Sequence, residues 1–118
     1  FDFNVTDSAA RANSVTTMLT GNVDPEVIRA YCEEIGGVVV GSGNGKLTGK
    51  ALRIAHMGHV NAPMMLGTLG VLETSFAALG IAHGRGGLQA AIDYLSRAVA
   101  PPANQRQTDP LMKTASGA

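Results

Sequence analysis

The stretch that most constrains the fold runs from Gly37 to Asn61, GVVVGSGNGKLTGKALRIAHMGHVN. Its first apolar run, Val38–Val40, is short, continuous and β-branched, which predicts a strand buried on both faces. Its second run, Ala51–His56, alternates, so that Arg53 shares its face of the strand with alanines two residues away on either side. The stretch therefore predicts two strands joined by a glycine-rich loop, with open space around one guanidinium.

The flanking sequence predicts the remaining elements. Ser14–Thr20 is rich in β-branched residues and alternates, which predicts a strand. Asp24, followed by proline, predicts a helix start, because its carboxylate can accept from a free backbone N–H and proline at the first position loses no hydrogen bond. Asn61 predicts a second helix start, and the spacing of apolar residues predicts a third helix over Leu88–Val99.

This order, β-α-β-β-α-α, predicts an α+β fold with a short, mainly antiparallel sheet covered by helices. We expect residues 1–100 to form one domain and residues 101–118, which are small and polar, to be a mobile C-terminal tail. Gly67 and Gly70 interrupt the second helix, where each costs about 1 kcal/mol relative to alanine. Such glycines predict close approach of another backbone.

Composition limits the partners. Charged residues make up 15% of the chain and Lys+Arg balance Asp+Glu at 9 each, so no basic excess favours nucleic acid or an anionic membrane. The low charge content predicts that another domain or subunit covers part of the surface. Cys32 is the single cysteine, which favours a reducing, cytoplasmic location. The chain begins at Phe1, and we expect it to be a piece of a longer polypeptide.

The glycine-rich loop does not match a phosphate-binding loop. Three residues separate Gly41 from Gly45 where four are needed, Lys46 is followed by leucine, and the loop leads into a strand instead of a helix. We interpret it as a flexible connection that can move over a pocket, with Ser42 and Asn44 as candidate pocket residues.

Two other candidate chemistries have weak support. His56 and His59 are three residues apart, but they flank a strand end with no Asp, Glu or Cys nearby, so we predict no metal site. His56 is expected to pack or hydrogen-bond locally. Cys32 lies on the apolar stripe of the helix that begins after Asp24, so it is expected in the core. It is not expected to be a nucleophile, because no base lies near it in sequence.

Arg53 has two interpretations from the residues alone. It is either an edge-strand residue that faces water, or a guanidinium fork that receives a carboxylate in two parallel hydrogen bonds.

The sequence GKLTGKALRIAHMG, followed by a helix, resembles the G-K-x-x-R-I-G-x-M-G signature of class V aminotransferases, the serine–pyruvate and alanine–glyoxylate group. The resemblance covers residues 13–99, and Ala55 replaces the usual glycine after R-I. It implies the smaller, C-terminal domain of a fold-type-I pyridoxal-phosphate enzyme, in which Arg53 grips the α-carboxylate of the substrate. Asn44 stands where the related pyridoxamine–pyruvate enzyme has a second arginine, which argues against pyridoxamine as substrate.

The resemblance also implies what lies outside the chain. Pyridoxal 5'-phosphate would be bound mainly by a larger upstream domain, which holds the lysine that forms the Schiff base with the cofactor. No catalytic residue is therefore expected here, and this chain alone should be inactive. Lys46 and Lys50 are then solvated loop lysines. The implied reaction moves an amino group from a small amino acid of the serine or alanine type to glyoxylate or pyruvate, in a homodimer.

Two alternatives stay open. The first is a non-catalytic regulatory domain that binds an amino acid, since such modules use β-α-β-β-α orders and glycine-rich loops. They normally end in a strand, whereas Leu88–Val99 predicts a helix. The second is a purely structural interaction domain, which would bind neither amino nor oxo acids.

Overall fold

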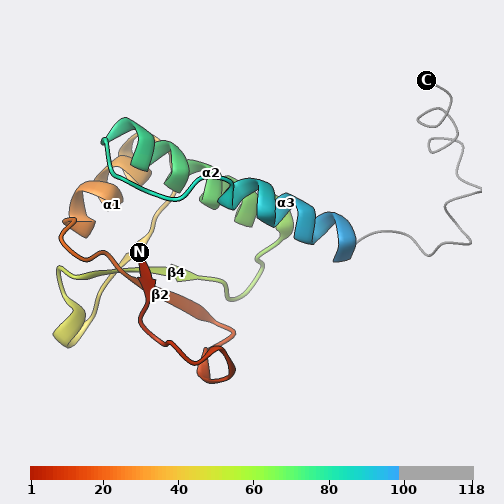
Figure 1. Cartoon of the computed structure of the whole chain (residues 1–118), viewed down its shortest axis with the longest axis horizontal. Coiled ribbons are helices and arrows are strands. Elements are labelled where there is room, and N and C mark those ends of the chain that lie inside the picture. The colour runs from red at the N-terminus through yellow and green to blue at the C-terminus, as the bar shows by residue number, and fades with distance from the viewer. Residues whose placement is uncertain (99–118) are drawn as a thin grey trace, which may run out of the picture. The chain divides into compact units, whose positions relative to one another are not determined.

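The computed structural model describes residues 1–98 (Figure 1). Within them, a four-stranded antiparallel sheet has the spatial order β1-β2-β4-β3. Its strands are β1 (Asp2–Phe3), β2 (Val15–Leu19), β3 (Gly41–Ser42) and β4 (Ala51–Ala55). The helices are α1 (Pro25–Glu34), α2 (Ala62–Ala78) and α3 (Gly87–Ala98), with short 3-10 helices η1 (Ser8–Ala10) and η2 (Gly45–Leu47). The predicted α+β class is confirmed.

The sheet is built around β2 and β4, the two strands with the clearest alternation in the sequence. They pair in register from Val15 opposite Ala55 to Leu19 opposite Ala51, which places Thr17 opposite Arg53. Because β4 lies between β2 and β3, it is an inner strand of the sheet.

Both predicted helix starts are confirmed by their caps. The Asp24 carboxylate accepts from the backbone N–H of Glu26 at 2.9 Å, and the Asn61 side chain accepts from that of Met64 at 3.0 Å. These bonds satisfy N–H groups that have no partner within the helix. α2 ends before Gly80, whose φ of 65° suits glycine.

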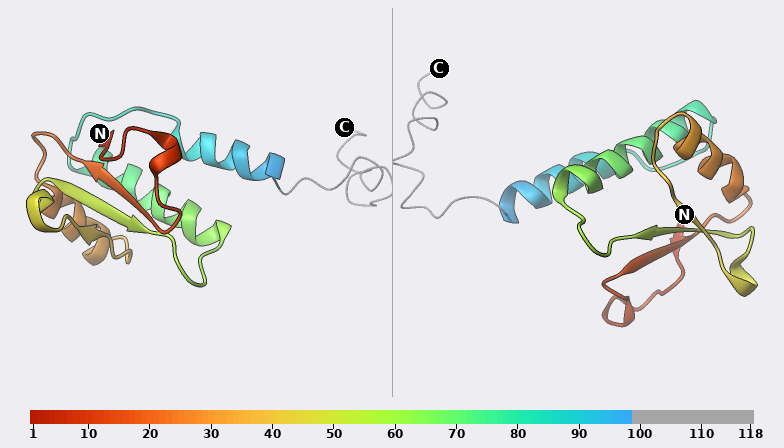
Figure 2. Two further views of the ribbon diagram at one scale, coloured as in Figure 1. Left: turned by 90° about the horizontal axis from the view of Figure 1, so that it is seen from below. Right: turned by 180° about the vertical axis from the view of Figure 1, so that it is seen from behind.

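Helices α1 and α2 lie on one face of the sheet (Figures 1 and 2). The core between these layers contains side chains from both helices, from β4 and from the segment before β3. Its fully or nearly fully buried members are Ile28, Cys32, Val40, Leu52 and Leu72. The predicted burial of Cys32 is therefore confirmed, and its thiol pKa is raised by desolvation, partly offset by a hydrogen bond with Ser75.

The prediction of a doubly buried strand over Val38–Val40 was wrong. Val39 is 75% exposed, and pairing with β4 begins at Gly41. The backbone N–H of Val38 donates to the Cys32 carbonyl at 2.8 Å, at the end of α1, so this segment completes the helix terminus before the sheet edge begins. Strand β1 was not predicted, because two residues carry no periodicity.

The expected close approach at Gly67 and Gly70 is not found within the described residues. A Cβ at Gly67 would have nothing within 4 Å, and one at Gly70 would make an ordinary contact of 3.8 Å with the Leu88 side chain. The close approach occurs instead at Gly36, where a Cβ would lie 2.3 Å from Cγ1 of Val71 on α2. Gly36 therefore lets the end of α1 approach α2.

The chain divides into two compact units, with the boundary between Leu88 and Gln89. The predicted third helix is confirmed as α3, whose residues from Gln89 onward belong to the second unit. Within it, the Gln89 amide donates to Asp93 at 2.9 Å. The predicted tail, residues 101–118, lies outside the described residues. Over residues 1–98, we find no helix that has both the length and the apolar character needed to cross a membrane.

Candidate functional site

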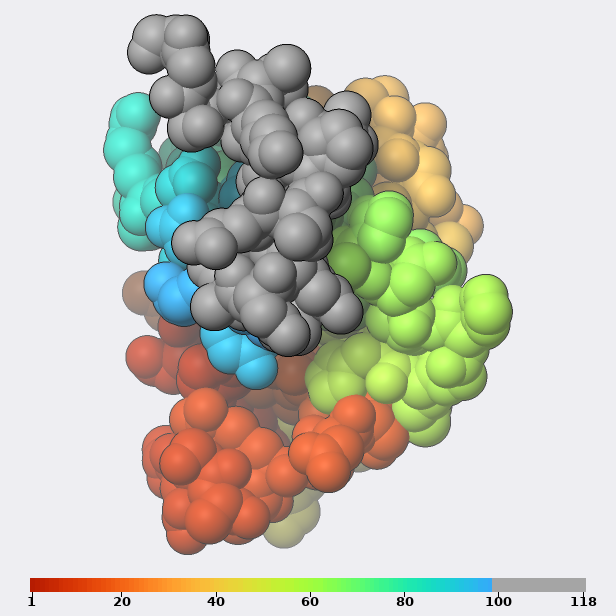
Figure 3. Space-filling view, turned by 90° about the vertical axis from the view of Figure 1, so that its right-hand side faces the viewer, coloured from red at the N-terminus to blue at the C-terminus, as the bar shows by residue number. Residues whose placement is uncertain are grey.

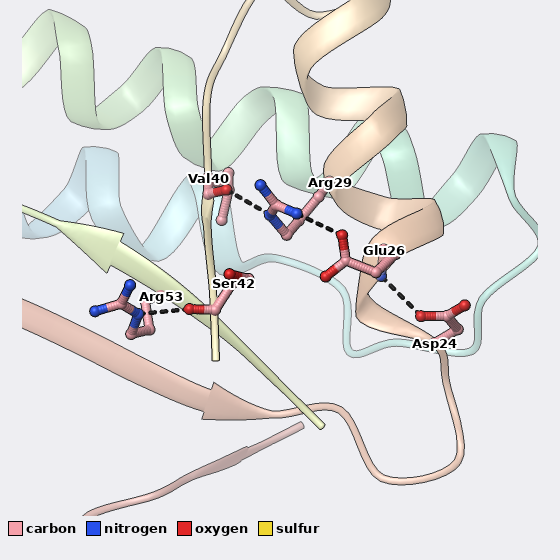
Figure 4. Close-up of polar contacts among 6 residues, drawn as sticks. All are labelled: Asp24, Glu26, Arg29, Val40, Ser42 and Arg53. Carbon is pink, nitrogen blue, oxygen red and sulfur yellow. Dashed lines mark hydrogen bonds and ion pairs between the residues drawn. The ribbon is translucent and has the colours of Figure 1, made fainter. Parts of the chain in front are cut away.

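Arg53 lies in the middle of β4 and is half-buried. Its Nε donates a hydrogen bond of 2.6 Å to the backbone carbonyl of Ser42 on the neighbouring strand β3 (Figure 4). A charged donor on a backbone acceptor makes a short, directional bond. The guanidinium is therefore oriented by the sheet edge itself.

Gly41 lies directly beside Arg53 on the neighbouring strand. It is paired directly with Arg53, and a Cβ built on it would lie 3.4 Å from Cβ and 3.7 Å from Nε of that arginine. The same Cβ would be 3.2 Å from the Arg53 carbonyl oxygen, which is tighter than an ordinary contact. A side chain at Gly41 would therefore press on the backbone of β4, while it would make only ordinary contacts with the Arg53 side chain.

A pocket of about 410 Å³ adjoins the Arg53 side chain. Its other polar side chains are the hydroxyls of Ser14 and Thr68, and none of its lining residues is acidic. Among residues 1–98, Arg29 and Glu26 form an ion pair, whereas Arg53 forms no ion pair. The remaining lining residues are apolar or glycine: Val15, Val39, Val40, Gly41, Ile54, Ala55 and Met57. A cationic group with apolar walls suits a small carboxylate.

The structure brings one of the two candidate loop residues to this site. Ser42 contacts Arg53 through its backbone carbonyl, whereas Asn44 is exposed, precedes η2 and does not line the pocket. Lys46 and Lys50 are also exposed and do not line it. Because the pocket lining includes neither a lysine nor an acidic side chain, these residues do not form a complete site for pyridoxal phosphate.

Arg29 of α1 was not singled out by the sequence. Its Nε donates to the Val40 carbonyl at 2.7 Å, and its Nη1 contacts Glu26, whose backbone N–H is bonded to Asp24 (Figure 4). The Glu26–Arg29 spacing indicates only a surface ion pair on a helix. The contact with Val40 depends on how the chain folds back over α1.

His56 has the local role expected from the sequence. Its Nδ1 lies 2.7 Å from the Asn13 carbonyl, which can only accept, so Nδ1 donates there, and Nε2 lies 2.9 Å from the Thr16 hydroxyl. Both ring nitrogens are thus occupied. Figure 3 shows the adjoining surface, where the orange segment around residues 11–13 lies beside the green segment after β4.

A second pocket, of about 240 Å³, lies beside α2. Its lining is mostly apolar and includes Met18, Leu72 and Phe76, together with His83 and the carboxylate of Glu73. An acidic side chain disfavours an anionic ligand by like-charge repulsion. The pocket at Arg53 is therefore the better candidate for binding a carboxylate.

No family model matches the chain, and no curated protein matches it. Several solved structures are similar to it, and two of them are aminotransferases. Pyridoxamine-pyruvate aminotransferase from Mesorhizobium loti has a TM-score of 0.72 and 27% identity, over 80% of this chain and 25% of that one. Ureidoglycine-glyoxylate aminotransferase from Bacillus subtilis has a TM-score of 0.67 and 30% identity, over 74% of this chain and 23% of that one.

The chain thus spans about a quarter of the length of these two enzymes, and the similarity covers most of its own residues. The sequence identities of 27% and 30% come with TM-scores of 0.72 and 0.67, so the fold is shared with both enzymes. The predicted resemblance is confirmed: the structural neighbours of this small α+β domain are class V-type aminotransferases.

Proposed function

We propose that this chain is the smaller, substrate-binding domain of a pyridoxal-phosphate-dependent aminotransferase, and that Arg53 binds the carboxylate of its substrates. The observation that carries the proposal is the oriented, half-buried guanidinium at the edge of a pocket without acidic side chains. The aminotransferase neighbours support the enzyme class.

The size of the site supports small substrates. A carboxylate on the Arg53 fork would leave the rest of the ligand against short apolar side chains and two hydroxyls. We propose a small amino acid of the serine or alanine type as donor, and glyoxylate or pyruvate as acceptor. The names of the two neighbours include pyruvate and glyoxylate as their own substrates. Asn44 does not line this pocket, and a contact between it and the substrate stays a prediction.

Arg53 would act by orientation. Two parallel hydrogen bonds fix both the position and the plane of a carboxylate, which aligns the bond at the adjacent carbon for proton removal. Pyridoxal phosphate supplies the electron-withdrawing chemistry when bound. Its contacts would come mainly from a larger domain outside this chain, so we propose that the fragment alone is inactive and that the intact enzyme is a homodimer.

The regulatory-domain alternative has less support. A module of that kind normally ends in a strand, whereas residues 87–98 form helix α3. The single, buried Cys32 supports the proposed cytoplasmic location, since it leaves no pair for an internal disulfide.

The direct test is an absorption spectrum of the intact protein, recorded before and after addition of a panel of small amino acids. Bound pyridoxal phosphate should give a visible band that one or more amino acids bleach, and the amino acid that bleaches it would be the donor. A protein that stays colourless after cofactor is supplied would contradict the proposal. Saturable amino-acid binding without the cofactor would favour the regulatory domain.

A further inference from the structure

Two arginines from different elements contact the same short segment, Val40 to Ser42. Arg53 of β4 donates to the Ser42 carbonyl at 2.6 Å, and Arg29 of α1 donates to the Val40 carbonyl at 2.7 Å (Figure 4). In both cases the donor is Nε. Guanidinium side chains thus bind two carbonyls, one just before the edge strand β3 and one on it.

We propose that the Ser42 carbonyl and Arg29 are positioning groups, which leave the two terminal nitrogens of Arg53 as the pair that binds the substrate carboxylate. This inference rests on the proposed function and deepens it. It assigns the mode of carboxylate binding and names Arg29 as a residue that acts through Arg53.

The first step concerns the geometry of the fork. A guanidinium can bind a carboxylate either through Nη1 and Nη2 or through Nε and one Nη. Because Nε of Arg53 already donates to Ser42, the terminal pair is the one free for two parallel bonds. The Ser42 acceptor is a neutral carbonyl, so it orients the guanidinium without neutralising the charge that attracts the ligand.

The second step concerns what fixes Ser42. Val40 has its side chain in the core, at 3% exposure, and its carbonyl is held by Arg29. Arg29 is itself held by Glu26 in the first turn of α1. Since Ser42 follows Val40 by two residues, these contacts set where its carbonyl lies, and α1 thereby contributes to the position of Arg53.

The third step concerns Gly41, which lies between the two carbonyls. A methyl group there would lie 3.7 Å from Nε of Arg53 and 3.2 Å from the carbonyl oxygen of the same residue. The tight contact is the one with the carbonyl oxygen, so β3 and β4 would have to shift by about a few tenths of an ångström at this pair. Because Ser42 and Arg53 lie on these two strands, Gly41→Ala should perturb the bond between them, and it changes no residue of α1.

The test uses the intact protein with ¹⁵N-labelled arginine, studied by NMR, with propionate as the carboxylate probe and propionamide as its neutral control. Arg53→Lys identifies the Arg53 signals. We expect the Arg53 Nε–H to exchange slowly with water before and after propionate binds, while the Nη signals shift on binding. Propionamide should bind more weakly than propionate.

The variants separate positioning from a general loss of structure. Arg29→Met should speed exchange of the Arg53 Nε–H and weaken propionate binding by about three- to tenfold, whereas Arg29→Lys should restore part of both, because an ammonium can still donate to Val40. Gly41→Ala should have the same two effects as Arg29→Met. It provides the test if Arg29→Met does not fold. Arg85→Met, at an exposed loop arginine, is the matched control and should change neither.

Two results would overturn the inference in different ways. If propionate binds but shifts the Nε signal most, or if Arg29→Met and Gly41→Ala leave exchange and affinity unchanged, the positioning scheme is wrong while the carboxylate site stands. If the wild-type protein does not bind propionate although its Nε–H is protected, the proposed function fails, and the inference with it.

Discussion

The Nε of Arg53 and the backbone carbonyl of Ser42 are joined by a 2.6 Å hydrogen bond between adjacent strands. The sequence alone allows two interpretations of Arg53, a water-facing residue or a carboxylate-binding group. The bond to Ser42 orients its guanidinium, as the second interpretation requires. Because Arg53 is on an inner strand and half-buried, it is not a water-facing residue of a sheet edge.

Under the proposed function, Arg53→Ala in the intact protein should raise KM for both proposed substrates, the amino donor and the oxo-acid acceptor, by about one to three powers of ten. The reason is that each charge-assisted hydrogen bond contributes about 1.5–3 kcal/mol and about 1.4 kcal/mol corresponds to a tenfold change in affinity. Steady-state kinetics with each substrate varied in turn would measure it. Arg53→Lys should recover only part of the loss, since an ammonium cannot form the planar fork. If KM is unchanged for both substrates, Arg53 does not bind the substrate carboxylate.

Gly36→Ala should destabilise the intact protein by about 1–3 kcal/mol, the usual cost of overpacking. The added methyl group would lie 2.3 Å from Cγ1 of Val71, and a β-branched side chain has little freedom to turn away. Thermal or denaturant unfolding would measure the loss.

A double-mutant cycle isolates this contact. Val71→Ala removes the clashing atoms, so the Gly36→Ala substitution should cost less in the Val71→Ala background than in the wild type. Equal costs in both backgrounds would mean that the two positions are not coupled.

Gly67→Ala distinguishes the two explanations for glycine in α2. Within the described residues nothing lies within 4 Å of a Cβ there, so the substitution should increase the free energy of unfolding by up to about 1 kcal/mol through helix propensity. Unfolding measurements on the intact protein, with oligomeric state followed by sedimentation, provide the test. A loss of stability or of assembly would instead place Gly67 against another domain or subunit.

Cys32 should resist alkylation in the folded protein. Its side chain is fully buried and desolvation raises the pKa of its thiol, which disfavours the reactive thiolate. Iodoacetamide labelling followed by mass spectrometry should proceed at a rate limited by unfolding. Rapid labelling under native conditions would contradict the burial of Cys32.

The same shift predicts a pH dependence of stability. Because the pKa is raised in the folded state, the unfolded chain loses its thiol proton first as the pH rises past about 8.5. The contribution of Cys32 to stability is therefore complete below that pH and declines above it. Cys32→Ala should reduce this alkaline decline, which unfolding curves at several pH values would detect.

The sequence by itself determined the elements that carry local signals. The caps Asp24 and Asn61, the alternation in β2 and β4, and the helical spacing in α3 all act over a few residues, so the helix starts and both long strands were predictable. The G-K-L…R-I motif also sufficed to indicate the aminotransferase resemblance and to single out Arg53.

Tertiary structure decided where the edge of the sheet begins and what holds Arg53. Val38–Val40 has the composition of a strand, yet its backbone groups are bound by the end of α1 and by Arg29, so pairing starts at Gly41. The contacts of Arg29 with Val40 and of Arg53 with Ser42 each join residues eleven positions apart. No local pattern records such contacts, because they form only when α1, the loop and the sheet are packed together.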